Sequence, residues 1–188
     1  MEREYLVLKE RDEDFIKRKL VHLGFRIDEN ILNSIKKAAK RTETTVSNQI
    51  NIILRNWVTR DTYFHELGFI PTSKDVLRAW VNKIEQNDLI TQAREFGLSA
   101  AEFIAYFFGE VNVTNMIKFL EILLSRFPSY DHRIENNIHS FHINHDICLK
   151  YSIFFSELLK SLIEPIIKGP VKVKNLTQKT IIISFDIL

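Results

Sequence analysis

The sequence contains few of the residues that fix special backbone or covalent structure. Its 188 residues include one cysteine, five glycines and four prolines. The single cysteine, Cys148, excludes a disulfide within the chain and is typical of a reducing compartment, so we expect a cytoplasmic protein. No apolar run approaches the length of a membrane span, and the charged first residues lack the apolar core of a signal peptide. These absences indicate a soluble globular protein.

The sequence also lacks the short motifs of common catalytic sites. It has no glycine-rich phosphate loop, no Gly-x-Ser-x-Gly elbow, no His-Glu-x-x-His helix and no paired-cysteine metal motif. Histidines lie near Cys148, but a buried free cysteine is commoner than a nucleophile. We therefore expect a protein that is not an enzyme and needs no cofactor, a metal ion being the one alternative considered below.

An ordered pattern of apolar and polar residues lies between residues 21 and 58. Val21–Ile27 alternates the two kinds, which predicts a β-strand. Its apolar face consists of Val21, Leu23, Phe25 and Ile27. Asp28 is placed to cap a following helix, and the polar run Arg41–Thr45 separates that helix from a second one. A unit of this size cannot bury its apolar stripes alone, so we expect it to pair with a partner.

This order and spacing, over residues 21–60, resembles the ribbon-helix-helix family of DNA-binding proteins, the class that includes Arc and MetJ. In that family two chains pair their strands into an antiparallel ribbon that enters the major groove. The resemblance implies that residues 21–60 form a DNA-binding and dimerisation domain. Its implied dimer core consists of Leu23, Phe25, Ile27, Ile50, Leu54 and Trp57.

The resemblance also implies which residues meet DNA. On the polar face of the strand, His22, Gly24 and Arg26 would face the bases, and the fork of Arg26 suits guanine O6 and N7. The family commonly has a polar side chain where this sequence has Gly24, so the base preference depends on the other two residues. The start of the second helix would offer backbone N–H groups to a phosphate. Its residues are Thr45, Val46, Ser47 and Asn48.

Positive charge is concentrated around the same stretch. Lys17–Arg60 holds ten Lys/Arg against three Asp/Glu, a surplus of seven, whereas the whole chain has a net charge of only +2. The remainder therefore carries about −5, an asymmetry that favours a nucleic-acid surface. Residues 1–20 are expected to be a charged arm or helix. Its basic residues Lys17, Arg18 and Lys19 are placed to touch phosphates or the minor groove.

Residues 61–188 are expected to form a helical and α+β sensory or oligomerisation domain. Ser73 predicts the start of a helix that extends to about Asn87. Leu89–Phe96 is predicted to be a helix closed by Gly97, and Ser99–Glu102 is a capping-box pattern that opens another. A further helix is predicted to start at Thr114 or Asn115 and to end before Pro128.

The last third of the chain predicts a small antiparallel sheet with a helix across it. Ile134–Ile143 is predicted to be one strand and Asp146–Ile163 a helix. Val171–Leu176 and Thr180–Ile187 predict a hairpin, which makes the sheet three-stranded. The predicted fold class is therefore α+β and mainly helical.

Two side-chain groups in this region are candidates for a site. The aromatic residues Phe103, Tyr106, Phe107 and Phe108 could line a ligand pocket, with core packing as the favoured alternative. Imidazole and thiolate would suit a zinc ion, and they recur every third residue at His139, His142, His145 and Cys148. On a strand the first two would point to opposite faces, so packed or surface histidines are the alternative. Histidines without a metal could give sensitivity to pH.

Together these observations predict a prokaryotic, dimeric, sequence-specific DNA-binding regulator such as a repressor. Its expected partners are double-stranded DNA and a second copy of itself, with a tetramer and a small-molecule effector as further possibilities and no membrane. An antitoxin-type or other protein-interaction module with the same fold is the alternative. In a third hypothesis the ribbon serves only to dimerise.

Overall fold

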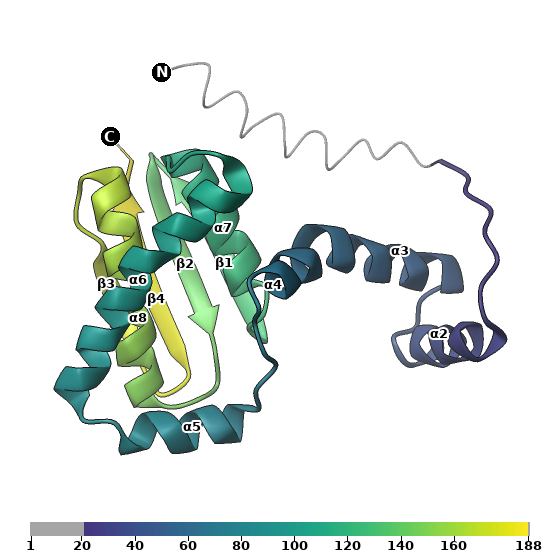
Figure 1. Cartoon of the computed structure of the whole chain (residues 1–188), viewed down its shortest axis with the longest axis horizontal. Helices are drawn as coiled ribbons and strands as arrows, with labels where there is room; N and C mark the ends of the chain where they lie inside the picture. Colours follow the sequence, from purple (N-terminus) through teal and green to yellow (C-terminus); the bar gives the residue numbers. More distant parts are fainter. Residues whose placement is uncertain (1–20, 188) are drawn as a thin grey trace. The chain divides into compact units, whose positions relative to one another are not determined.

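A computed structural model describes residues 21–187, and the chain divides into two compact units at Ile52 and Ile53 (Figure 1). The expectations for the N-terminal arm, including Lys17, Arg18 and Lys19, lie outside the described residues. The first unit is built on a helix pair and the second on a sheet with helices. The protein is therefore α+β, as the sequence predicts.

The helix pair begins with α2, Glu29–Arg41, and continues with α3, Val46–Asn56, whose last four residues already belong to the second unit. The expected cap at Asp28 is confirmed, and the polar run between the helices forms the expected turn. The segment Val21–Ile27 has no regular secondary structure in the single chain. A strand needs a neighbour for its backbone hydrogen bonds, and no described segment pairs with this one. The ribbon therefore stays a prediction about two chains.

Helical backbone continues beyond α3 to Glu66, past residue 60, where the expected DNA-binding domain ends. Next after α3 come a π-helical turn, η1 (Trp57–Asp61), and a short helix, α4 (Thr62–Glu66). The Thr62 hydroxyl donates to the Trp57 carbonyl at 2.8 Å, which ties the two ends of the π turn together. The short helix α4 then carries Tyr63 and buried Phe64.

Four further helices of the second unit are α5 (Lys74–Lys83), α6 (Gln86–Phe108), α7 (Val113–Leu124) and α8 (Leu149–Ile167). Ser73 caps α5 as expected, because its hydroxyl accepts the Val76 N–H at 3.3 Å. The α7 helix starts one or two residues earlier than predicted, since Asn112 is its cap and accepts the Asn115 N–H at 2.9 Å.

Gly97 does not close a helix, and the predicted break at this point is wrong. Residues 86–108 form one continuous helix, and Ser99 donates to the Glu95 carbonyl inside it rather than capping a new one. A Cβ at Gly97 would overlap the Leu158 carbonyl oxygen of α8 and lie 2.8 Å from the Ser161 Cβ. The glycine therefore serves the close approach of α6 and α8.

The strands of the second unit are β1 (Ser129–Glu135), β2 (Ile138–Asn144), β3 (Lys172–Leu176) and β4 (Thr180–Asp186). Within the described residues they form a four-stranded antiparallel sheet in the order β1-β2-β4-β3. The predicted three-stranded sheet is wrong because Ile134–Ile143 is not one strand. Asn136 and Asn137 adopt positive φ angles of 49° and 66°, which makes a two-residue hairpin turn between β1 and β2.

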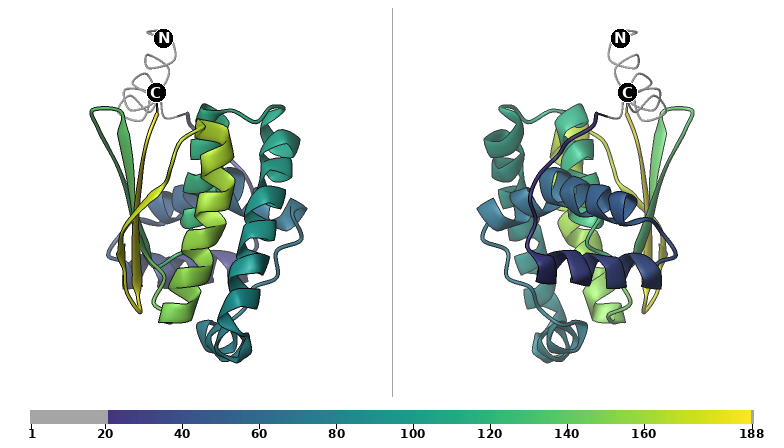
Figure 2. Two further views of the ribbon diagram at one scale, coloured as in Figure 1. Left: turned by 90° about the vertical axis from the view of Figure 1, so that its left-hand side faces the viewer. Right: turned by 90° about the vertical axis from the view of Figure 1, so that its right-hand side faces the viewer.

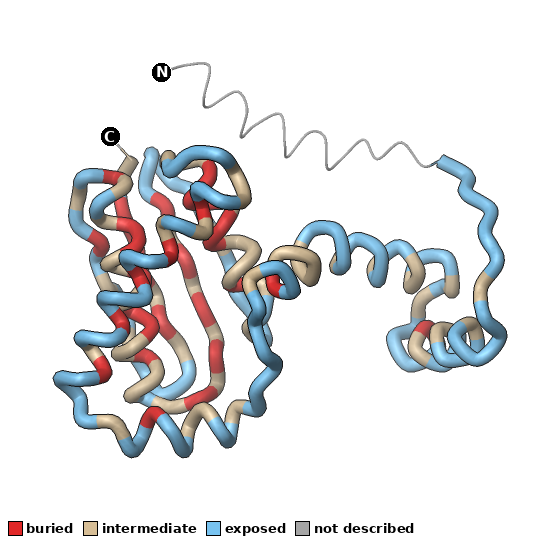
Figure 3. Tube along the Cα trace, viewed as in Figure 1, coloured by how far each residue is buried: buried red, intermediate tan, exposed pale blue. Residues whose placement is uncertain are grey.

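The main core lies between the sheet and the helices α6, α7 and α8, which lie on one face of the sheet (Figure 2). Along β2, buried residues alternate with more exposed ones, so Phe141 and Ile143 face the helices while Ser140 and His142 face away. Figure 3 shows the buried positions gathered along these strands and helices. Alternation of this kind is typical of an antiparallel sheet covered on one face.

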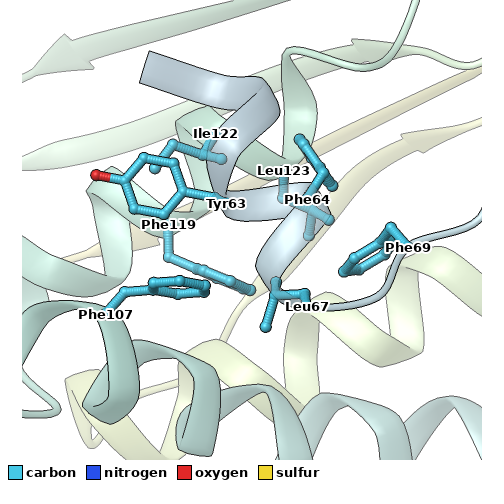
Figure 4. Close-up of a pocket in the computed structure, with 8 residues that line it drawn as sticks. All are labelled: Tyr63, Phe64, Leu67, Phe69, Phe107, Phe119, Ile122 and Leu123. Carbon is cyan, nitrogen blue, oxygen red and sulfur yellow. The ribbon is translucent and has the colours of Figure 1, made fainter. Parts of the chain in front are cut away.

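Aromatic side chains hold α4 against α6 and α7 (Figure 4). The rings of Tyr63 and Phe107 meet edge to face with centroids 4.9 Å apart, and those of Phe64 and Phe69 do so at 5.1 Å. The space left between these side chains is about 10 Å³, no more than a single water needs. This part of the second unit is therefore close-packed.

None of the helices within residues 21–187 is long and apolar enough to span a bilayer.

Candidate nucleic-acid interface

Asp28 fixes the start of α2 directly after the segment that carries His22, Gly24 and Arg26. Its carboxylate accepts the backbone N–H of Asn30 at 2.8 Å and of Ile31 at 3.3 Å. The cap places the start of a defined helix three residues after Arg26, whose side chain is exposed. His22 and Gly24 are exposed as well, and no described atom lies within 4 Å of a Cβ built on Gly24.

The N-terminus of α3 is also built by local side chains. The Thr45 hydroxyl accepts the Asn48 N–H at 3.1 Å, and the Asn48 amide donates to the Thr44 hydroxyl at 2.7 Å. The N–H groups of Val46 and Ser47 have no partner among the described residues. Free N–H groups at the positive end of a helix dipole are the usual place for an anion. The residues predicted to meet a phosphate therefore lie at one helix start.

Exposed cations surround these two segments. In residues 21–56 they are Arg26, Lys36, Lys37, Lys40, Arg41 and Arg55. None of these six forms an ion pair with a described residue, whereas several cations of the second unit do. Unpaired cations are available to neutralise phosphates without first breaking a salt bridge.

The apolar residues expected in a dimer core are uncovered in the single chain. Leu23, Phe25 and Trp57 are 73%, 54% and 54% exposed, and Leu54 is exposed as well. Ile27 and Ile50 are half-buried, and no residue of α3 is fully buried. A group of large apolar side chains left open to water is typical of a surface that binds another protein.

The structure separates the histidines of the proposed metal cluster. On β2, His139 faces the core and His142 faces away, as expected from their odd spacing. The imidazole of His145 makes two hydrogen bonds, accepting the Ile147 N–H at its Nδ1 (3.0 Å) and contacting the Ser152 hydroxyl through its Nε2 (2.7 Å). Among residues 21–187 no group of three or more His, Cys, Asp or Glu side chains is arranged to hold a metal ion.

His145 is held neutral by these contacts and by burial. Because the Ile147 N–H donates to Nδ1, that nitrogen carries no proton, and Nε2–H donates to Ser152. Burial lowers the pKa of His145 to about 4. Cys148 lies at the start of α8, and its carbonyl accepts the Ser152 hydroxyl at 3.4 Å. His145 and Cys148 thus both contact Ser152.

A chain of three side chains, from partly exposed Glu121 to buried His139, joins α7 to the sheet, and the sequence does not reveal it. The Glu121 carboxylate contacts His132 Nδ1 at 3.1 Å, and His132 Nε2 contacts His139 Nδ1 at 2.9 Å. Burial, and then the neighbouring His132, lower the pKa of His139 to about 4. His139 also stacks on Phe185 with centroids 5.5 Å apart. A turn predicted at Asn136–Asn137 would have placed His132 and His139 on adjacent antiparallel strands.

The aromatic group of α6 divides between packing and a cavity. Phe107 packs against Tyr63, Phe108 packs on the core, and Tyr106 is exposed. Phe103 packs against the core and also lines a cavity of the second unit. Core packing, the favoured alternative, therefore describes two of the four residues fully.

Comparisons of the chain with protein-family models, curated proteins and solved structures give no significant match.

Proposed function

We propose that the chain is a homodimeric, DNA-binding transcriptional regulator whose residues 21–58 hold the DNA. The observation that carries the proposal is the surface of the helix pair. Within residues 21–57, six cations have no ion pair and the large apolar side chains Leu23, Phe25, Leu54 and Trp57 are uncovered. A second copy would cover the apolar side chains, and phosphates would neutralise the cations.

The dimer would form through the segment that has no partner in the single chain. Two copies of Val21–Ile27 pair as antiparallel strands, so that Leu23 and Phe25 turn toward the helices and His22 and Arg26 turn toward the DNA. Successive side chains of a strand point to opposite faces, so the apolar and the polar residues separate in this way. The capped start of α2 at Asp28 supports it, because the helix begins immediately after the strand.

Base readout in this arrangement depends on few side chains. Arg26 bonds guanine and His22 is its neighbour on the same face, while Gly24 permits close approach without reading a base. The free N–H groups of Val46 and Ser47 each bind a phosphate oxygen, with Asn48 beside them. Most of the affinity comes from phosphate contacts, and DNA shape contributes to specificity.

Residues 53–188 favour a regulator over an antitoxin-type module. They form a compact unit with its own apolar core, including Phe141, Leu159 and Ile183, whereas toxin-binding tails are often short and fold on binding. Limited proteolysis should leave a stable fragment that begins before α4, between about residues 53 and 61. Rapid loss of that fragment would favour the antitoxin.

The dimer is tested by sedimentation velocity with Leu54→Asp. In the single chain Leu54 is exposed, so a charge there would cost little in a monomer. We expect the wild type to sediment as a dimer and Leu54→Asp to shift toward monomer, because the carboxylate would be buried in the interface. Asn51→Asp, an exposed position on the same helix, is the control that should remain dimeric. A monomeric wild type would overturn the proposed assembly.

Base readout is tested with Arg26→Ala on a site selected from random DNA. Loss of the bidentate guanine contact should weaken binding by about 1–3 kcal/mol while the variant remains a folded dimer. A gel-shift titration measures the affinity, and circular dichroism checks the fold. Unchanged affinity would remove Arg26 from the interface.

A further inference from the structure

The second unit contains a cavity of about 700 Å³ that the proposed function does not use. Its wall is formed by residues of α4 to α8 and of the segments that join them. Aromatic residues make up much of the lining, among them Phe64, Phe69, Phe96, Phe103, Phe127 and Tyr151. The volume lies within the range of about 300–1,000 Å³ that is usual for sites of small organic molecules. A ligand that is mainly apolar would fit this lining.

The charged groups at the cavity are of one sign. Lys74 and Arg126 belong to the lining, which contains no aspartate or glutamate. His145, the remaining titratable base there, is neutral, because its Nδ1 accepts a backbone N–H. A ligand that carries one negative charge would therefore meet two cations in the lining, with the nearest carboxylates, Asp146 and Asp61, just outside it.

Both cations are held only weakly by the protein. Lys74 Nζ lies 3.4 Å from the Asp146 carboxylate, and an Arg126 nitrogen lies 3.6 Å from that of Asp61. The side chains of both pairs are partly exposed, and such pairs contribute little to stability. The Arg126 guanidinium also lies over the Phe64 ring at 4.0 Å, which keeps it at the cavity wall. Either cation can exchange its partner for a ligand anion at small cost.

Tyr151 adds a polar group that lacks a partner. Its ring stacks on Phe155 with centroids 5.8 Å apart, and burial raises the pKa of its hydroxyl. Among residues 21–187 the only buried side-chain polar atom without a hydrogen-bond partner is Asn144 Oδ1. The Tyr151 hydroxyl, which bonds to no described residue, is therefore open to the cavity. A donor without an acceptor on the wall of an apolar cavity suits a ligand that brings an oxygen.

We propose that this cavity binds a small amphipathic carboxylate, with its apolar body among the phenylalanines and its carboxylate at Lys74 or Arg126. The binding site stands apart from the proposed DNA-binding function, because every group invoked lies in residues 53–188.

The test is isothermal titration calorimetry on the full chain with two carboxylates, octanoate and 1-naphthoate. The matched amines are octylamine and 1-naphthylmethylamine. We expect at least one carboxylate to bind saturably with one site per chain, at least about tenfold more tightly than its amine, as one charge-assisted contact implies. If only octanoate binds, the ligand is an aliphatic carboxylate, and if only naphthoate binds, it is an aromatic one. If both bind, the site accepts amphipathic carboxylates of either kind.

Variants place the binding in the cavity. Lys74→Gln and Arg126→Gln should together weaken carboxylate binding by about tenfold or more, since they remove both cations from the lining. Lys83→Gln, on the same helix as Lys74 but outside the lining, should not.

A second pair of variants blocks the space itself. Ser99 lines the cavity from an exposed position, so Ser99→Trp should fill it without disturbing the core, and carboxylate binding should be lost. Gln92→Trp, on the same helix and outside the lining, is the control. Circular dichroism confirms that each variant folds. Amines that bind as tightly as the carboxylates, no binding of either carboxylate, or unchanged binding in Ser99→Trp would each overturn the proposal.

Discussion

Replacing Gly97 by alanine sets two opposite effects against each other. In an exposed helix interior the change would stabilise the protein by about 0.8–1.0 kcal/mol, because alanine is the better helix former. In α6 the new methyl group would overlap the Leu158 carbonyl oxygen and lie 2.8 Å from the Ser161 Cβ. The obstacle is mainly the backbone of α8, which cannot rotate away as a flexible side chain can.

The structure therefore predicts that the steric effect wins. Overpacking a well-packed contact costs typically 1–3 kcal/mol, and a backbone obstacle places this site toward the upper end. After subtraction of the gain in helix propensity, Gly97→Ala should lower the free energy of unfolding by about 2 kcal/mol. The two helices would have to move apart along a contact that leads into the main core.

Urea unfolding followed by circular dichroism at 222 nm measures this difference. Gly169→Ala is the matched control, because a Cβ there would lie 3.9 Å from its nearest neighbours, in ordinary contact. Its unfolding free energy should change little. A Gly97→Ala protein that is as stable as the wild type, or more stable, would refute the close approach of α6 and α8.

Three further outcomes follow from caps and buried histidines. Asp28→Ala should cost about 1 kcal/mol of helix stability, measured by urea unfolding, whereas Asp28→Asn should keep most of it because asparagine also caps. The folded-state pKa values of His139 and His145, both about 4, lie below the ordinary 6.5. Their contribution to stability is therefore full above pH 6.5 and is lost as the pH falls toward 4, at up to about 1.4 kcal/mol per pH unit for each histidine. Unfolding free energies between pH 7 and 5 should show this slope, and a flat profile would contradict it. His139→Phe should reduce the slope, because one of the two histidines no longer takes up a proton on unfolding.

Local signals in the sequence predicted two of the helix starts well. Asp28 and Ser73 act as caps through hydrogen bonds to residues two or three positions away, so the sequence around them contains the whole interaction. The hairpin formed by residues 172–186 was predicted within a residue or two for the same reason. Apolar alternation and a polar turn are both local.

Features that depend on distant contacts were predicted poorly. A glycine that ends a helix and one that admits a neighbouring helix look alike until α8 is in place, so Gly97 was misread. The turn at Asn136–Asn137 lies inside a run that alternates well enough to resemble a single strand. The Glu121–His132–His139 chain joins α7 to two strands, and no spacing along the sequence reveals it.

For the candidate sites too, local features could be predicted from the sequence and features that depend on distant contacts could not. The positions of Arg26 and of the α3 start followed from the pattern of residues 21–58, while pairing of the strands needs a second chain that no single-chain geometry supplies. The cavity could not be foreseen, because its lining comes from segments as far apart as Phe64 and Leu158. Only the aromatic residues of α6 gave an indication of it, through Phe103.

The central claim, that this chain binds DNA through its basic helix pair, is tested most directly by fluorescence anisotropy with a labelled random-sequence duplex. We expect binding at low salt that weakens steeply as the salt concentration rises, because phosphate contacts release counterions. Lys36→Gln and Lys37→Gln should each make that salt dependence shallower by about one unit of slope if the lysine contacts a phosphate. Absence of binding to the duplex at low salt would contradict the account.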